Sequence, residues 1–363
     1  MGLFMTTTTP ANKMVGLELN NEWLVERIIP VGTKTGIGTG GNFSVSYEVK
    51  NKNTGKMAFL KAFDFEKTMQ EALSKGHDFM KIMSVLTSDY QFEDKLNEIC
   101  IEKRMRNVIK VLNKGQSVID GRIVPYLIME LAESGDIRMY VERTKDVSLA
   151  MKLGYLKDVT MGIRQLHSAN ISHQDLKPSN VMVFDSLNAK VGDLGRASLQ
   201  GVPHRFDNFP ITGDQNYAPP EQLYGLIAPE WINRRQRCDI YQLGSIVAFL
   251  FTGRTVNSLM REFVPTEIAP PRWGGSGNQY DLALPYLEKA FFQSLEVFDG
   301  VHPDWLGLGL KNIVLQCSHP SYENRGMLKG GGIAKIELGL DRLITQFDLL
   351  IQKLKVFGLS NKI

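Results

Sequence analysis

A predicted β-hairpin near the middle of the chain constrains its fold more than any other sequence feature. Residues 181–184 and 189–191 are short apolar runs, and the polar residues between them favour a turn. Because a hairpin returns the chain on itself, Asn180 just before it and Asp193 just after it should lie close together. Both side chains offer oxygen atoms, which are the ligands that Mg²⁺ prefers. The sequence therefore predicts that Asn180 and Asp193 share a divalent metal ion at one end of this hairpin.

The ten residues that lead into the hairpin, 171–180, carry a dense set of polar side chains. Phosphoryl transfer requires a carboxylate that orients a hydroxyl and accepts its proton, a cation near the transferred group, and an oxygen ligand for Mg²⁺. Asp175, Lys177 and Asn180 can supply these three groups from one short loop. The alternative is a polar loop in which Asp175 and Asn180 serve as turn residues. The second motif, Gly192-Asp193-Leu194-Gly195, favours the chemical interpretation because it supplies the other metal ligand.

Composition narrows the class of protein. Hydrophobic residues make up 43% and charged residues 22% of the 363 residues, which is ordinary for a globular domain. A net charge of +3 gives no basis for nucleic-acid binding. No apolar run reaches the roughly 18 residues that a membrane span needs. Three widely spaced cysteines, Cys100, Cys238 and Cys317, predict neither a zinc site nor disulfides, and fit a reducing, cytoplasmic environment.

Hydrophobic periodicity divides the chain into a β-rich front and a helical back. Strands are predicted at residues 23–30, 43–50, 56–63, 108–112 and 124–131, and a helix from about residue 92. Helical patterns dominate beyond residue 136, at 149–168, 241–251, 284–297 and 333–357. Residues 1–22 are expected to form a flexible lead-in, and residues 64–90 an insertion. We therefore expect an α+β chain with a small antiparallel front and a larger, mainly helical back.

The two polar motifs together resemble the catalytic and metal-binding loops of eukaryotic-type serine/threonine protein kinases, here in the form of their bacterial eukaryotic-like members. Gln174 stands where that family has arginine, and Leu194 where it has phenylalanine. The resemblance extends, with gaps, from about residue 24 to 325. It implies the two-lobed protein-kinase fold, with an N-lobe at 23–131 that carries one helix, a C-lobe at 132–330 with an insertion at about 255–310, and a C-terminal helical segment at 331–363.

By resemblance, the chain transfers the γ-phosphoryl group of ATP to Ser or Thr hydroxyls of protein substrates, itself included, with Mg²⁺ or alternatively Mn²⁺. Asp175 would be the catalytic base, Lys177 would meet the γ-phosphoryl group, and Asn180 and Asp193 would hold the metal. Residues 255–310 are a candidate partner surface. Two alternatives remain open: a pseudokinase that binds or scaffolds with little turnover, and a kinase-like phosphotransferase acting on a small molecule.

The resemblance also assigns residues to the nucleotide. Lys61 would pair with the phosphates and with a helix glutamate, either Glu93, which helical spacing favours, or Glu98. Backbone groups of Glu130 and Ala132 would bond the adenine edge. The full set of residues expected at the nucleotide is Gly38, Gly40, Gly41, Lys61, Glu130, Ala132, Asp136, Asn180 and Met182.

Three further expectations concern the C-lobe. Asp239 would hold the backbone of the catalytic loop, and Glu221 would form a partly buried ion pair with Arg325. Because Gln174 carries no charge, it cannot pair with a phosphate as the family's arginine does. We therefore expect activity that does not depend on phosphorylation of the segment containing Ser198 and Thr212.

Overall fold

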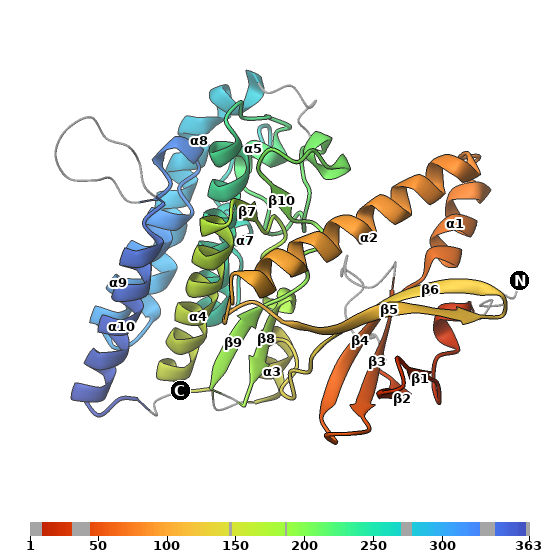
Figure 1. The fold of residues 1–363 in the computed structure, drawn as a ribbon. Coiled ribbons are helices and arrows are strands. Elements are labelled where there is room, and N and C mark those ends of the chain that lie inside the picture. Colours follow the sequence, from red (N-terminus) through yellow and green to blue (C-terminus); the bar gives the residue numbers. More distant parts are fainter. Residues whose placement is uncertain are drawn as a thin grey trace, which may run out of the picture. The chain divides into compact units, whose positions relative to one another are not determined.

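The structure is a computed structural model that describes residues 9–30, 44–144, 147–185, 187–269, 278–326 and 338–360. The chain divides into two compact units (Figure 1). Unit 1 comprises Met1–Arg104 and Ile109–Ala132, and unit 2 comprises Met105–Val108 and Glu133–Ile363. Within the described ranges, no helix combines the length and the apolar character needed to cross a membrane.

Unit 1 is built on a six-stranded antiparallel sheet with the strand order β1-β2-β3-β4-β6-β5. Its strands are β1 (Glu18–Leu19), β2 (Trp23–Ile28), β3 (Ser44–Asn51), β4 (Met57–Phe63), β5 (Val111–Ile119) and β6 (Arg122–Glu130). Short turns join β1 to β2, β3 to β4 and β5 to β6. Asp120 and Gly121, between β5 and β6, both have positive φ, as a two-residue hairpin turn requires. The strand expected at 108–112 runs instead to residue 119, because it pairs along β6 despite its polar sequence.

Two helices accompany this sheet, where we expected one. They are α1 (Phe65–Ser74) and α2 (Phe79–Glu102). The side chains of Asp64 and Asp78 cap their N-termini by accepting hydrogen bonds from the backbone N–H groups of Lys67 and Lys81. Residues 64–90, predicted as an insertion, are therefore α1 and the first half of α2. The predicted start of the helix near residue 92 was too late by more than ten residues.

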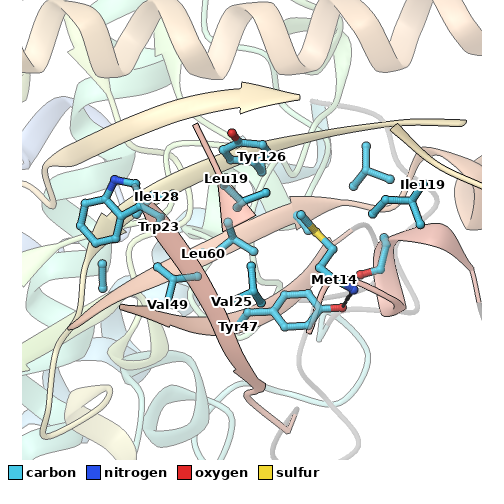
Figure 2. Close-up of a cluster of buried hydrophobic side chains, with 14 residues drawn as sticks. Met14, Leu19, Trp23, Val25, Tyr47, Val49, Leu60, Ile119, Tyr126 and Ile128 are labelled. Carbon is cyan, nitrogen blue, oxygen red and sulfur yellow. Dashed lines mark hydrogen bonds between the residues drawn. The ribbon is translucent and has the colours of Figure 1, made fainter. Parts of the chain in front are cut away.

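Residues 9–22 are not the flexible lead-in that we expected. They form the 3₁₀ helix η1 (Pro10–Asn12) and strand β1. Ala11 and Met14 are buried in an apolar cluster with residues of β2, β3, β4, β5 and β6, as Figure 2 shows for Met14. The Tyr47 hydroxyl donates a hydrogen bond of 2.5 Å to the Ala11 carbonyl. Burial of these side chains fixes a segment whose polar composition suggested mobility.

Unit 2 is mainly helical. Its α-helices are α3 (Ile137–Arg143), α4 (Leu149–Ser168), α5 (Pro220–Leu223), α6 (Arg237–Thr252), α7 (Val256–Met260), α8 (Asn278–Ser294), α9 (Asp304–Cys317) and α10 (Leu340–Val356). Short elements complete it: strands β7 (Ile171–Ser172), β8 (Val181–Phe184), β9 (Asn188–Val191) and β10 (Ser198–Leu199), 3₁₀ helices η2 (Pro178–Asn180), η3 (Arg205–Asn208), η5 (Leu295–Gly300) and η6 (Tyr322–Asn324), and the π-helical turn η4 (Ile232–Gln236).

Helix α6 lies at the centre of unit 2, and most of its residues are buried. Gly244 allows close packing against the end of α9, since a Cβ atom there would lie 2.1 Å from the Ser318 hydroxyl oxygen. The C-terminal helix α10 packs along α4, where Lys157 and Asp348 form an ion pair at 2.9 Å. These helices support the segment that runs from β7 to α5, which carries the candidate site.

Candidate active site

A buried carboxylate on α6 clamps the polar loop of residues 171–180. Asp239 is fully buried and accepts hydrogen bonds of 2.8 Å from the backbone N–H groups of His173 and Gln174. It also accepts the Ser172 hydroxyl and contacts His167 Nε2, each at 2.8 Å. Burial alone would raise the pKa of Asp239, but the hydrogen bond and charge of His167 and the backbone donors outweigh it and lower the pKa. Gln174 Nε2 adds a weaker hydrogen bond of 3.4 Å, so the expected role of Asp239 is visible as five contacts to an ionised carboxylate.

The predicted hairpin is present as β8 and β9, and Val181 pairs with Val191 at its open end. One residue further out, the Gly192 N–H donates to the Asn180 carbonyl at 2.9 Å, and His173 Nε2 lies 2.8 Å from the Gly192 carbonyl. Asp193 follows with a positive φ of 59°. The hairpin thus brings the backbones at Asn180 and Asp193 together, as the sequence predicted.

The side chain of Asp175 is oriented from several directions. Lys177 Nζ lies 3.0 Å from Asp175 Oδ2, and Asn180 Nδ2 donates to the Asp175 carbonyl at 2.8 Å and to Oδ2 at 3.2 Å. The other oxygen, Oδ1, accepts the backbone N–H of Asp214 at 2.7 Å. Gly213 makes this approach possible, because a Cβ atom there would lie 2.4 Å from the Gln174 carbonyl oxygen. The three residues predicted to act together therefore do form one cluster.

In unit 1, Lys61 on β4 reaches Glu93 on α2, with 2.7 Å between Nζ and Oε1. The two side chains are 18% and 8% exposed. Glu98, the rival that we left open, instead binds Lys114 of β5, as does Asp94. Helical spacing separates the two glutamates, because Glu93 is buried with one stripe of α2 whereas Glu98 lies off it.

The remaining residues expected at the nucleotide divide between the units. Glu130 ends β6 in unit 1, where its N–H donates to the Lys110 carbonyl, and Ala132 follows at the end of that unit. In unit 2, Asp136 forms a β-bridge with Met182, and its side chain caps α3. Gly38, Gly40 and Gly41 lie outside the described residues.

Comparison with known proteins decides the family. Residues 32–263, well over half of the chain, match the family model of the protein kinase domain. The chain belongs to the protein kinase family. Its antiparallel sheet and helical unit confirm the predicted α+β, two-lobed kinase class, with unit 1 as the N-lobe and unit 2 as the C-lobe.

Individual relatives carry the same description. The kinase is 31% identical to serine/threonine-protein kinase PknL of Mycobacterium tuberculosis, over 41% of this chain and 35% of the relative. It is 29% identical to a probable serine/threonine-protein kinase of Corynebacterium efficiens over 41% of this chain and 22% of the relative. It is 25% identical to serine/threonine-protein kinase PLK4 of Danio rerio over 59% of this chain and 20% of the relative. The matched region is about a third or less of each of these relatives. They confirm the predicted kinship with serine/threonine protein kinases, bacterial eukaryotic-like members included.

The far end of the kinase's activation segment, defined here as residues 193–221, is tied to the core by a buried ion pair. Arg325 NH1 and NH2 bind the two carboxylate oxygens of Glu221, each at 2.6 Å. The pKa of Arg325 is raised: burial opposes its charge, but the charge of Glu221 and the hydrogen bonds to it prevail. This pair, predicted from the sequence, is fully buried rather than partly buried.

Two polar residues of the kinase's site were missed in the sequence. Gln242 accepts the Leu176 N–H at 2.9 Å and donates to the Gln174 carbonyl at 3.0 Å. Arg235 donates to the Gln174 side chain at 3.0 Å. Arg235 lies four residues before Asp239 and Gln242 lies three residues after it, so both are within about one helical turn. Helical spacing from Asp239 was the signal that could have identified them, because residues three and four apart share a face.

The donor set at the hairpin suits a magnesium ion. In the parts of the chain that the structure describes, no group of three or more His, Cys, Asp and Glu side chains could hold a metal. Mg²⁺, however, is usually bound through one or two carboxylates together with substrate phosphates and water. Asn180 turns its amide nitrogen toward Asp175, so its side-chain oxygen is the atom that could serve, with the Asp193 carboxylate, as a metal ligand. This pair of oxygens fits the ion.

Proposed function

We propose that this kinase transfers the γ-phosphoryl group of ATP to Ser or Thr hydroxyls of protein substrates, including its own, and that it depends on Mg²⁺. The observation that carries the proposal is the cluster of Asp175, Lys177 and Asn180 on a loop clamped by Asp239. The names of the relatives support Ser and Thr as the acceptors. The run Leu176-Lys177-Pro178-Ser179-Asn180 supports the same choice by its resemblance to Ser/Thr rather than Tyr kinases.

In the proposed reaction, Asp175 orients the substrate hydroxyl and receives its proton. The hydroxyl oxygen forms a bond to the γ-phosphorus, while the bond from that phosphorus to the β–γ bridging oxygen breaks and ADP leaves. Lys177 lies beside Asp175, so its ammonium group can stabilise the negative charge on the transferred group. The N–H of Asp214 holds the other carboxylate oxygen, which keeps Asp175 in one orientation.

Asn180 and Asp193 would hold Mg²⁺ through their side-chain oxygens. When bound, the ion neutralises charge on the phosphate oxygens. Lys61, positioned by Glu93, would contact the α- and β-phosphates, and Asp136, Met182 and the backbone groups of Glu130 and Ala132 would contact the nucleoside. Gly38, Gly40 and Gly41 would contribute backbone N–H groups to the phosphates. Residues 255–310 remain our candidate for a partner surface.

Transfer of label from γ-labelled ATP tests the proposal. The full chain should label itself and a generic protein substrate on Ser or Thr in the presence of Mg²⁺, and Asp175→Asn should abolish the label. Asp341→Asn is the matched control, because this carboxylate is 77% exposed on α10, outside the candidate partner surface, and should leave labelling unchanged. Nucleotide binding without label in the wild type would instead favour the pseudokinase. Label on a small-molecule acceptor alone would favour the third alternative.

A further inference from the structure

A buried arginine beside the catalytic loop has no part in the proposed chemistry. Arg235 lies in the π-helical turn η4 just before α6, and its side chain is 1% exposed. NH1 donates to Gln174 Oε1 at 3.0 Å, and NH2 lies 3.1 Å from Asp207 Oδ1. Removing a guanidinium group from water is costly unless it is paired and hydrogen bonded. A weaker hydrogen bond from NH2 to the Phe206 carbonyl, at 3.5 Å, adds to these two contacts. Arg235 is therefore held between the residue next to Asp175 and the activation segment, where Asp207 supplies the negative charge.

Gln174 connects this arginine to the catalytic loop. Its backbone has a positive φ of 68°, and Asp175 follows directly. The side-chain amide nitrogen donates to the Ser172 hydroxyl at 2.6 Å and to the Arg235 carbonyl at 2.9 Å. The side-chain oxygen accepts from Arg235 and, at 3.4 Å, from the Thr212 hydroxyl. Both ends of the amide are therefore engaged, which fixes its orientation beside Asp175.

Asp207 connects the same arginine to the middle of the activation segment. It lies in η3 with its side chain 23% exposed. Besides Arg235, its carboxylate accepts the Ser198 hydroxyl at 3.1 Å and the backbone N–H of His204 at 2.8 Å. Trp231, which precedes η4, in turn donates to the Ser198 hydroxyl at 3.2 Å. The side chain of Asp207, and not an added phosphate, thus lies at the centre of the contacts that order this segment.

We propose that Arg235 and Asp207 are positioning residues: their charge pair orders the activation segment and, through Gln174, aligns Asp175 without any phosphate. The inference rests on the proposed kinase activity and extends it to its control. A phosphate orders such a segment by supplying negative charge to an arginine. Here the arginine comes from η4 rather than from position 174, and the negative charge is the Asp207 side chain. The ordered arrangement therefore needs no modification.

The first test is Asp207→Asn, which keeps the shape of the side chain but leaves Arg235 without its charge partner. We expect kcat toward a protein substrate to fall at least about tenfold while KM for ATP stays unchanged. Hydrogen exchange at the amides of residues 198–212 should speed up. The matched control is Asp341→Asn, which removes an acid from a surface pair with Arg164 on α4, outside the candidate partner surface, and should change neither reading.

The second test moves the positive charge to the position where the family carries it. Gln174→Arg alone would place two guanidinium groups together in a buried site, and should lower kcat and loosen the segment. Combining Gln174→Arg with Arg235→Gln leaves one guanidinium and one amide in the same space, still facing Asp207. We expect the double variant to recover most of the wild-type kcat and amide protection. A purely space-filling role for Arg235 would not produce this recovery.

The exchange measurement separates this proposal from the proposed activity, because it needs no turnover. An inactive wild type whose segment still loosens in Asp207→Asn would refute the activity and retain the positioning pair. Wild-type kcat and wild-type exchange in a folded Asp207→Asn would overturn the positioning pair. Should Asp207→Asn not fold, the double variant decides: recovery of protection supports the pair, and a folded double variant as loose as Gln174→Arg rejects it.

Discussion

The residues proposed for catalysis are held in different ways in the two units. In unit 2, Asp239 is completely buried, and groups of four residues, His167, Ser172, His173 and Gln174, converge on it to fix the loop that bears Asp175. In unit 1, the Lys61–Glu93 pair joins β4 to α2 and is still partly reached by solvent. The proposed base is thus set in a rigid, desolvated frame, whereas the lysine proposed to bind the phosphates depends on a pair nearer the surface. Such rigid support keeps a reacting group within the narrow limits that catalysis requires.

This contrast implies that damage in the two units should have different consequences. Loss of a buried, multiply bonded carboxylate leaves several donors without partners, so it should affect folding and activity together. Loss of the Lys61–Glu93 pair should cost less stability than that, because the Lys61 side chain is 18% exposed and keeps some contact with water. It can still misplace the lysine. The predictions below test this division, beginning with the largest expected effect.

Replacing Asp239 with alanine should have the largest effect. The backbone N–H groups of His173 and Gln174 would lose their acceptor in the interior, and His167 would lose its partner. We expect the free energy of unfolding to fall by about 3–5 kcal/mol, the range measured when one member of a buried charged pair is removed. Chemical denaturation followed by circular dichroism would measure this loss.

Asp304→Ala provides the control for that experiment, because its carboxylate lies on the surface of the same unit. A loss below about 1 kcal/mol for Asp239→Ala would contradict the clamp, since surface substitutions commonly fall within that range.

Glu93→Gln should separate activity from stability in unit 1. The amide cannot pair electrostatically with Lys61, so the ammonium group is no longer held in one place. We expect kcat/KM to fall about 100-fold, as is typical when a positioning contact is lost, and the free energy of unfolding to fall by less than it does in Asp239→Ala. Steady-state kinetics and denaturation of the same variant would measure both.

Glu98→Gln is the matched control on the same helix, because Glu98 contacts the exposed Lys114 instead. Its kinetics should equal those of the wild type. A similar kinetic defect in the two variants would mean that Glu93 acts through the general stability of α2, and would remove the contrast between the units.

Much of the site could be predicted because its signals are local. The β8–β9 hairpin follows from two apolar runs around a polar turn, and it alone brings Asn180 beside Asp193. Likewise, helical angles were sufficient to prefer Glu93 over Glu98. The buried arginine at position 235 could not be predicted by composition, because an arginine in a polar stretch ordinarily lies on the surface. Its burial depends on Asp207 and Gln174, which are distant in sequence.

The errors in the predicted fold also come from contacts between residues that are distant in sequence. Residues 9–22 looked mobile because they are polar, yet Ala11 and Met14 are buried under contacts with Tyr47 on β3. Residues 64–90 looked like an insertion because their sequence is polar and mixed, yet they form α1, which buries none of its residues, and the first half of α2. Only tertiary contacts distinguish these segments from loops. Propensity and periodicity cannot include such contacts.

Lowering the pH should weaken the contacts between Asp239 and the loop of residues 171–180. The loss of stability should be smaller than when Asp239 is replaced. The pKa of Asp239 lies below its ordinary 3.8, because burial raises it less than His167 and the backbone donors lower it. A carboxylate with a depressed folded-state pKa stabilises the fold above its unfolded pKa, and loses this contribution as the pH falls through the folded pKa. The stability difference between wild type and Asp239→Asn, which cannot titrate, should therefore shrink from about pH 6 to about pH 3. A difference that stays constant over this range would contradict an ionised Asp239.

The smallest effect on activity is expected at Ser198 and Thr212, the hydroxyl residues of the activation segment where a regulatory phosphate would be looked for first. Ser198 and Thr212 are both buried, and each gives one hydroxyl hydrogen bond to the network around Arg235. Ser198→Ala with Thr212→Ala should cost only about 0.5–1.5 kcal/mol of stability per bond, and activity should persist, because the Arg235–Asp207 charge pair remains. Kinetics on enzyme pretreated with a phosphatase would measure this alongside the untreated wild type. Loss of all activity in the double variant or after the phosphatase would mean that a phosphate, and not Asp207, orders the segment.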